Sequence, residues 1–163
     1  NDSKGNYDMN DFFQKGMGSV FENFVYNFYS IKLPAYQVRN GECIKWDSDQ
    51  QDGFYPTMKT DITIRDKETL LVIDTKYYQN MFNYHYLNPE KPKFISSNIY
   101  QLYTYLNNLQ EDGRSIEGML LYPNTTSTIR NERFISGKKM MIYNLNLNQD
   151  WKDIESEMMS IIN

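Results

Sequence analysis

A pair of apolar, β-rich runs constrains the fold of this chain more than any other feature. The runs span residues 57–65 and 70–78, and a polar turn at residues 66–69 separates them. This pattern predicts an antiparallel hairpin centred between positions 67 and 68. Residues whose numbers add to 135 then face each other, which brings Asp61 directly opposite Asp74.

The predicted hairpin places conflicting charges together. Two carboxylates that face each other on adjacent strands, roughly 5 Å apart at Cβ, destabilise a sheet unless a cation neutralises them or one keeps its proton. Lys76 shares the face of Asp74, because side chains alternate along a strand. A Mg²⁺ ion held by one or two carboxylates resolves the conflict, and the lysine can activate water or offset charge on a phosphate. The pattern favours a metal-assisted phosphodiester hydrolase over the plainer alternative, a solvated aspartate paired with a lysine.

The rest of the pattern predicts a single α/β domain over residues 1–163. The expected elements, in chain order, are a helix over 8–30, a short hairpin over 36–46 that turns at Asn40-Gly41, the central hairpin, a long loop over 79–95, a helix capped by Ser96 or Ser97 that ends near 110, a strand over 116–122, a polar loop through 137, a strand over 140–147, and a helix after Asp150.

Charge and cysteine content exclude several classes of protein. The formal net charge is −4, whereas a free-standing nucleic-acid binder is usually basic, so DNA binding has to depend on a local patch or on a partner. One cysteine and one histidine exclude a disulfide framework and a zinc cage of Cys and His ligands. The sequence contains no apolar stretch long enough to span a membrane, and we expect a cytoplasmic protein.

Five segments carry a resemblance to a known family. Residues 56–61 and 71–78 resemble the signature of PD-(D/E)XK nucleases, with Thr60 where the name of the signature has proline. In detail, residues 18–25, 99–105 and 118–123 are similar to the first-helix motif, the Gln-x-x-x-Tyr helix and the following strand of the McrC family, the nuclease subunits of McrBC restriction systems. The segments occur in the family's order, which makes the match far more specific than Asp-x-Lys alone.

The resemblance implies a restriction-endonuclease-like α/β fold, a mixed central sheet flanked by helices, in a PD-(D/E)XK domain from the C-terminal part of a longer McrC-like protein. It implies a metal bound by Asp61, Asp74 and Glu22, with Lys76 as the catalytic lysine and Glu22 completing the catalytic set. The implied metal is Mg²⁺, for which Mn²⁺ can substitute.

The implied activity is DNA cleavage as the endonuclease subunit of a modification-dependent, 5-methylcytosine-type restriction system. The chain has no Gly-x-x-x-x-Gly-Lys-Ser/Thr motif, so a separate McrB-like AAA+ GTPase has to supply the motor. A dimer is expected where both DNA strands are cut.

Four further residues, Gln101, Tyr105, Lys91 and Lys93, are candidates for orienting the site or binding DNA. The alternatives are a half-exposed polar helix face for Gln101 and Tyr105, and solvated charges for the lysines. Without the resemblance, Glu22 would be interpreted as a solvated glutamate. For the whole chain, the alternatives are a DNA repair or recombination nuclease of the same fold and a non-catalytic adaptor that holds DNA or a motor subunit.

Overall fold

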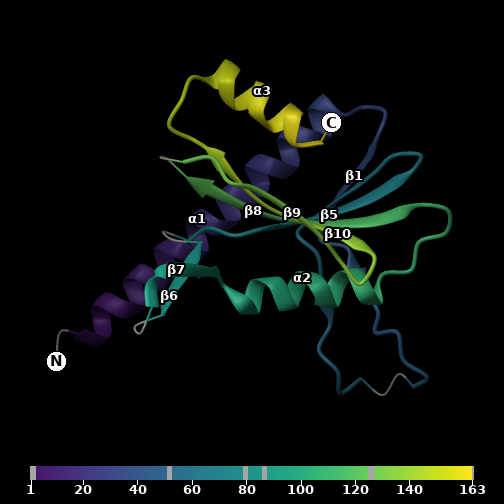
Figure 1. Ribbon diagram of the computed structural model, residues 1–163, viewed down its shortest axis with the longest axis horizontal. Helices are drawn as coiled ribbons and strands as arrows, with labels where there is room; N and C mark the ends of the chain where they lie inside the picture. Colours follow the sequence, from purple (N-terminus) through teal and green to yellow (C-terminus); the bar gives the residue numbers. More distant parts are fainter. Residues whose placement is uncertain (1–2, 51–52, 79–80, 86–87, 125–126, 163) are drawn as a thin grey trace.

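The computed structural model of the chain describes residues 3–50, 53–78, 81–85, 88–124 and 127–162. At its centre lies a six-stranded sheet with the order β1 (Gln37–Asn40), β4 (Ile62–Arg65), β5 (Thr69–Thr75), β8 (Ser115–Asn124), β10 (Lys138–Asn146) and β9 (Arg130–Ile135) (Figure 1). The strands β5, β8 and β10 run parallel, and the other pairs are antiparallel. Two small sheets pair β2 (Cys43–Ile44) with β3 (Met58–Lys59), and β6 (Phe82–His85) with β7 (Asn88–Phe94).

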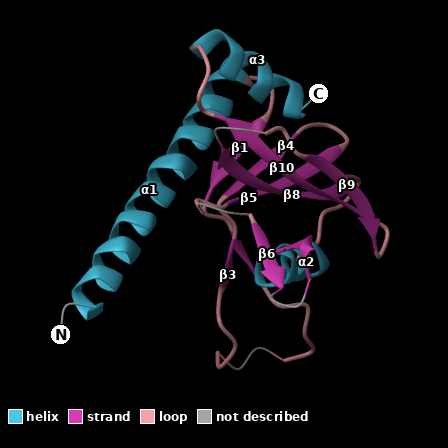
Figure 2. Cartoon of the chain, turned by 60° about the vertical axis from the view of Figure 1, so that its left-hand side comes forward, coloured by secondary structure: helices cyan, strands magenta, loops and turns pink. Residues whose placement is uncertain are grey.

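Helices cover both faces of the central sheet (Figure 2). The helices α1 (Ser3–Lys32) and α3 (Trp151–Ile162) contribute Val25 and Met158 to the core on one face, and α2 (Ser96–Asn108) contributes Leu102 and Leu106 to the core on the other. The single α/β domain that the pattern predicts, and the mixed central sheet flanked by helices that the resemblance implies, are therefore present. Within the described residues, no helix combines the length and the apolar character needed to cross a bilayer.

The strand β5 is covered on both faces, which accounts for its continuous apolar run. Leu71 and Ile73 belong to the core under α1 and α3, whereas Val72 belongs to the core under α2. Because side chains alternate along a strand, Asp74 follows Val72 onto the α2 face. A carboxylate that is only 1% exposed thus lies near the end of a central strand.

The predicted register of the central hairpin is confirmed. Ile62 pairs with Ile73 and Arg65 with Leu70, and both pairs add to 135. The Asp66 side chain sets the turn, because its Oδ1 accepts hydrogen bonds from the backbone N–H groups of residues 68 and 69, each at 2.7 Å. The apolar pattern and the turn chemistry together fix the register.

The predicted hairpin over residues 36–46 is wrong. The strand β1 pairs with β4, and β2 pairs with β3 outside the central sheet. Gly41 has a φ of +68°, a left-handed conformation that favours glycine, and its N–H donates to the carbonyl of Asp61 at 2.9 Å. The turn therefore binds the later chain rather than folding back on itself. It also interrupts the strand predicted over 57–65, which is divided into β3 and β4 at Thr60 and Asp61.

Two regions predicted as loops contain strands. Within residues 79–95, β6 and β7 pair, and the rings of Phe82 and Phe94 stack with centroids 5.0 Å apart. Two prolines hide β7 in the sequence, but a two-stranded edge tolerates proline. In the polar region that ends at residue 137, β9 forms an edge strand whose side chains are nearly all exposed, so it lacks an apolar pattern.

The boundaries of α2 differ from those predicted. Ile95 occupies the N-cap position without a side-chain hydrogen bond, so the predicted cap at Ser96 or Ser97 is wrong. The helix ends at Asn108 rather than near 110. Packing against the sheet defines this helix more strongly than capping does, since Leu102 and Leu106 are fully buried.

Gly118 in β8 allows α2 to approach the sheet closely. A Cβ at this position would lie 2.8 Å from a methyl carbon of Leu106 and 2.9 Å from one of Leu102. Because both leucines are fully buried and have no room to move, we expect Gly118→Ala to lower the free energy of unfolding by about 1–3 kcal/mol, measured by urea denaturation. The control is Gly16→Ala at an exposed position of α1, where a Cβ meets nothing within 4 Å. This substitution should raise the free energy of unfolding by about 0.5–1 kcal/mol. Equal stability of the two variants would contradict the close packing of α2 on β8.

Candidate active site

Asp74 and Lys76 form the centre of the candidate site, near the carboxyl end of β5. Oδ2 of Asp74 lies 2.7 Å from Nζ of Lys76, and the two side chains are 2% and 14% exposed. The backbone N–H of Lys76 donates to the carbonyl of Leu121 at 2.9 Å, which holds the chain against β8 just beyond the strand. The pair expected from the alternation of β5 is therefore present and sheltered from solvent.

The electrostatic environment pushes the pKa of Asp74 upward. Burial raises the pKa of its carboxyl to about 6, and the negative charges of Asp61 and Glu22 add to this, although the Lys76 ammonium opposes it. For Lys76, burial alone would lower the pKa of the ammonium, but the carboxylates of Asp74 and Asp61 outweigh burial and raise it. Lys76 thus stays protonated at neutral pH, and Asp74 carries a charge that the protein has only partly compensated.

Asp61 occupies a bend one residue before β4 begins. The sequence predicted that strand pairing holds Asp61 directly opposite Asp74. That prediction is wrong, because the ladder between β4 and β5 ends at the pair Ile62 and Ile73. Oδ2 of Asp61 instead accepts hydrogen bonds from the backbone N–H of Thr75 at 2.8 Å and from the Thr75 hydroxyl at 2.9 Å. The negative charge of Asp61 contributes to the raised pKa values of both Asp74 and Lys76, so it lies near the pair.

Glu22 approaches the same cluster from α1. Its side chain is half-buried, and burial followed by the charge of Asp61 raises the pKa of its carboxyl, while a hydrogen bond with Asn40 and the charge of Lys59 oppose the rise. The sequence alone favoured a solvated glutamate at this position. In the structure the Glu22 carboxyl lies within electrostatic reach of Asp61, and its role at a metal site stays a prediction.

Gln101 and Tyr105 connect α2 to the lysine. Nζ of Lys76 donates to Oε1 of Gln101 at 2.8 Å, and Nε2 of Gln101 donates to the hydroxyl of Tyr105 at 2.7 Å. The two residues lie four apart on one helical face, so both reach the sheet. This chain of hydrogen bonds orients the Lys76 ammonium. Gln101 is exposed and Tyr105 is buried, so the helix face is half-exposed, and the role of the two residues in orienting the site stays a prediction.

Sequence reasoning missed Thr75, Asn98 and Tyr122. Asn98 is buried and lies three residues before Gln101, and its Nδ2 donates to the Tyr122 hydroxyl at 2.9 Å. Burial raises the pKa of Tyr122 to about 12, so its hydroxyl keeps its proton. The helical spacing of Asn98 and Gln101 was a usable signal. Thr75 occupies the unspecified middle position of Asp-x-Lys, so no sequence signal marked it.

Lys91 and Lys93 lie apart from this cluster. Both are exposed on β7, which belongs to a separate two-stranded sheet. In the part of the chain that the structure describes, no ion pair or hydrogen bond joins them to Asp74, Lys76 or Asp61. They are available to solvent or to a ligand, but the structure does not bring them into the candidate active site.

The donor atoms suit a hard divalent cation. Oδ2 of Asp74 is buried, and among the described residues no donor is aligned for a hydrogen bond with it, although the Lys76 ammonium is close. No three His, Cys, Asp or Glu side chains in the described ranges are grouped tightly enough to cage a metal by themselves. Mg²⁺ needs only one or two carboxylates and keeps several waters, so Asp61 and Asp74 fit this ion.

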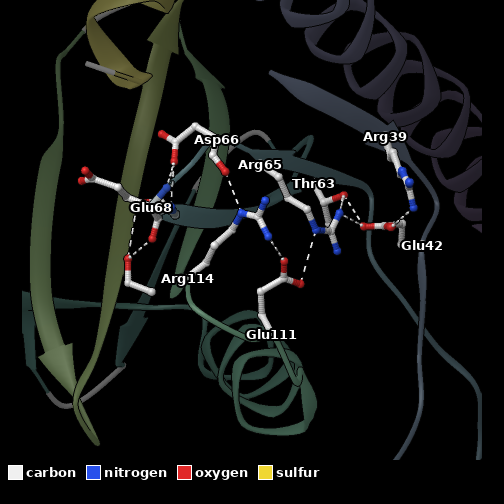
Figure 3. Close-up of polar contacts among 10 residues, drawn as sticks. Arg39, Glu42, Thr63, Arg65, Asp66, Glu68, Glu111 and Arg114 are labelled. Carbon is white, nitrogen blue, oxygen red and sulfur yellow. Dashed lines mark hydrogen bonds and ion pairs between the residues drawn. The ribbon is translucent and has the colours of Figure 1, made fainter. Parts of the chain in front are cut away.

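A charged network surrounds the Glu42 side chain (Figure 3). The Glu42 carboxylate accepts hydrogen bonds from Arg39 at 3.1 Å and Arg65 at 2.7 Å, and also from the hydroxyl of Thr63. Arg65 continues to Glu111, which pairs with Arg114 at 2.8 Å. This network anchors the turn that contains Glu42.

Residues 12–123 match the family model of the McrBC 5-methylcytosine restriction system component. The chain belongs to this family. It is also 35% identical over 166 residues to the type IV methyl-directed restriction enzyme EcoKMcrBC of Escherichia coli strain K12. That match covers 98% of this chain and 47% of the relative, so the chain spans about half the length of the relative. The resemblance to McrC is confirmed, and all the residues of the candidate site lie within the McrBC family match.

Proposed function

We propose that this chain is the metal-dependent endonuclease domain of a McrBC-type restriction system, with a PD-(D/E)XK fold, and that it hydrolyses phosphodiester bonds of DNA. The observation that carries the proposal is the buried pair of Asp74 and Lys76, with Asp61 and Glu22 beside it. Membership of the restriction-system family supports it. An ionised carboxylate this deeply buried and only partly compensated is costly to a folded protein, which favours a functional role.

Asp61 and Asp74 are the residues that would hold the divalent cation, Mg²⁺ or Mn²⁺, and the Glu22 carboxylate lies within electrostatic reach of both without forming a three-residue cage with them. When bound, such an ion lowers the pKa of water and stabilises negative charge on a phosphate. Asp74 contributes a rigid ligand because it belongs to a central strand, and Glu22 adds a third negative charge. Together these carboxylates repel a phosphate in the absence of a cation, so the site depends on its metal.

Lys76 is the proposed catalytic lysine. Its ammonium, held by Gln101 and Asp74, offsets the charge that develops on the phosphate or orients the attacking water. Gln101 and Tyr105 act as positioning residues, because they reach the reaction through Lys76. Asp74 and Gln101, with Tyr105 behind Gln101, limit the motion of the ammonium, which lowers the entropic cost of reaching the reactive geometry.

DNA and a McrB-like GTPase are the proposed partners. Lys91 and Lys93 are exposed cations that can neutralise phosphates, although the net charge of −4 opposes tight binding to DNA by this chain alone. Delivery by a motor subunit that recognises 5-methylcytosine would remove the need for such binding. Cleavage of both strands would require two copies of the domain, or two successive cuts by one.

A cleavage assay with metal removal tests the proposal. We expect the chain, mixed with a McrB-like GTPase and GTP, to cut a methylated linear duplex in Mg²⁺ or Mn²⁺ and to lose all cutting when EDTA is present. An unmethylated duplex of the same sequence is the substrate control. Cutting that persists in EDTA would contradict the metal site. Binding of DNA or the GTPase without any binding of Mn²⁺ in calorimetry would favour the adaptor instead.

A further inference from the structure

The main chain of Asp61 is fixed by the turn that contains Gly41 and Glu42. The N–H of Gly41 donates to the carbonyl of Asp61 at 2.9 Å, and the N–H of Thr60 donates to the carbonyl of Glu42 at 2.9 Å. The charged network of Figure 3 holds the Glu42 side chain at the same time. The position of the Asp61 Cβ is therefore set, and the remaining freedom of the residue is rotation of its carboxylate.

Thr75 removes most of that freedom. Its backbone N–H and its hydroxyl both donate to Oδ2 of Asp61, at 2.8 and 2.9 Å. In the described part of the chain, no other hydrogen bond reaches this carboxylate. Two donors on one oxygen engage the lone pairs of Oδ2, and they leave Oδ1 as the atom that can accept a further partner.

We propose that Thr75 is a positioning residue whose hydroxyl holds the Asp61 carboxylate so that Oδ1 is presented to the divalent cation. The inference rests on the proposed metal-dependent function. Thr75 can play this role because it is the last residue of β5 and directly follows Asp74, so that its N–H and its hydroxyl reach the Asp61 carboxylate from the strand that carries the first ligand. Three consecutive residues thus supply a proposed metal ligand (Asp74), the ammonium group (Lys76) and the hydroxyl that orients the second ligand (Thr75).

The hydroxyl matters because the backbone N–H alone cannot fix the plane of the carboxylate. A single donor restrains one oxygen but permits rotation about it, whereas two donors from different directions define the orientation. Hydrogen-bond partners of metal ligands typically change metal affinity by about 10–100-fold when they are removed. The expected loss for the hydroxyl alone lies near the lower end of this range, because the N–H stays in place.

Isosteric substitution tests the role. We expect Thr75→Val to weaken Mn²⁺ binding about tenfold in titration calorimetry, and Thr75→Ser, which keeps the hydroxyl, to bind within about twofold of the native chain. In cleavage assays, Thr75→Val should raise the Mg²⁺ concentration for half-maximal rate by a similar factor, with kcat at saturating Mg²⁺ changed by less than about threefold. Thr75→Ala removes the same hydroxyl in a smaller side chain and should reproduce the loss if Thr75→Val folds poorly.

The matched control is Thr69→Val, the same substitution at the other end of β5. The Thr69 hydroxyl contacts only the hydroxyl of Ser115 at 3.3 Å among the described residues, so Mn²⁺ affinity should not change. If the native chain binds no Mn²⁺, the proposed function itself is wrong. If the native chain binds Mn²⁺ but Thr75→Val binds it equally well, or Thr75→Ser binds it as weakly as Thr75→Val, the positioning role is wrong and the proposed function stands.

Discussion

Asp74→Asn should lower the rate of DNA cleavage by at least about a thousandfold, which corresponds to about 4 kcal/mol of lost transition-state stabilisation. Asparagine keeps the size of the side chain but removes the charge that a divalent cation requires from this strand. The Mn²⁺ affinity should fall in parallel, because Asp74 is a proposed ligand with a buried oxygen on which no hydrogen bond is aligned among the described residues. Single-turnover cleavage of a methylated duplex and Mn²⁺ calorimetry are the measurements.

The same substitution should stabilise the metal-free protein at neutral pH. Burial raises the pKa of Asp74 from 3.8 to about 6, so the folded protein holds this proton more tightly than the unfolded chain does. The stability linked to the proton is fully present below about pH 4 and is lost as the pH rises to about 6. At pH 7.5 in EDTA, Asp74→Asn avoids the cost of that buried charge. Its free energy of unfolding should exceed that of the native chain by up to about 3 kcal/mol, at 1.36 kcal/mol for each pKa unit. Urea denaturation at pH 4.0 and pH 7.5 measures both ends of this window.

Asp112→Asn is the control for both effects, since Asp112 is exposed in the loop between α2 and β8. It should leave cleavage, Mn²⁺ affinity and stability unchanged. Undiminished cleavage by Asp74→Asn would remove the basis for the proposed active site. If Asp74→Asn is less stable than the native chain at pH 7.5, the ion pair of Asp74 with Lys76 outweighs the cost of burying the carboxylate.

Lys76→Met should reduce cleavage by about a hundredfold to a thousandfold while it preserves or strengthens metal binding. The native ammonium lies 2.7 Å from Oδ2 of Asp74 and competes there with any other cation. Removing it frees the carboxylate, but it also removes a charge that lowers the pKa of Asp74, so Mn²⁺ binding should be measured at pH 8.5, where the carboxylate is ionised. The expected outcome, tight metal binding without cleavage, differs from the loss of both in Asp74→Asn.

Lys67→Met provides the comparison for Lys76→Met. Lys67 is exposed in the turn between β4 and β5, so its loss tests the effect of one fewer positive charge on the whole chain. Its cleavage rate should stay within about twofold of the native rate. If Lys76→Met cleaves at the native rate, the lysine is a structural counter-ion of Asp74 and takes no part in the reaction.

The central hairpin was predictable because its residues carry redundant information. Two apolar runs that flank a short polar segment locate the turn, and the Asp66 side chain fixes the turn independently through its hydrogen bonds to the backbone of residues 68 and 69. The pairing of Asp74 with Lys76 then follows from alternation alone. The same kind of redundancy, apolar spacing with a buried partner, made the three helices predictable.

The surroundings of Asp61 were not predictable for a physical reason. Its carboxylate is placed by a turn 20 residues earlier and by Thr75, and such contacts leave no periodic trace in a sequence. The strand β9 was hidden because an exposed edge strand needs no apolar face. Glu22 was identified only through the resemblance, since a half-buried glutamate at the margin of an apolar helix face has the spacing of a solvated one.

The pairing of β2 with β3 gives the chain a built-in attachment point for a fluorophore. Cys43 is the single cysteine of the sequence, is exposed, and pairs with Lys59, two residues before Asp61. A thiol-reactive dye on Cys43 would therefore sit on the segment whose backbone supports Asp61, with no other thiol to compete for the reagent. Changes in its emission as cations are added would follow the movement of this segment in the otherwise native chain.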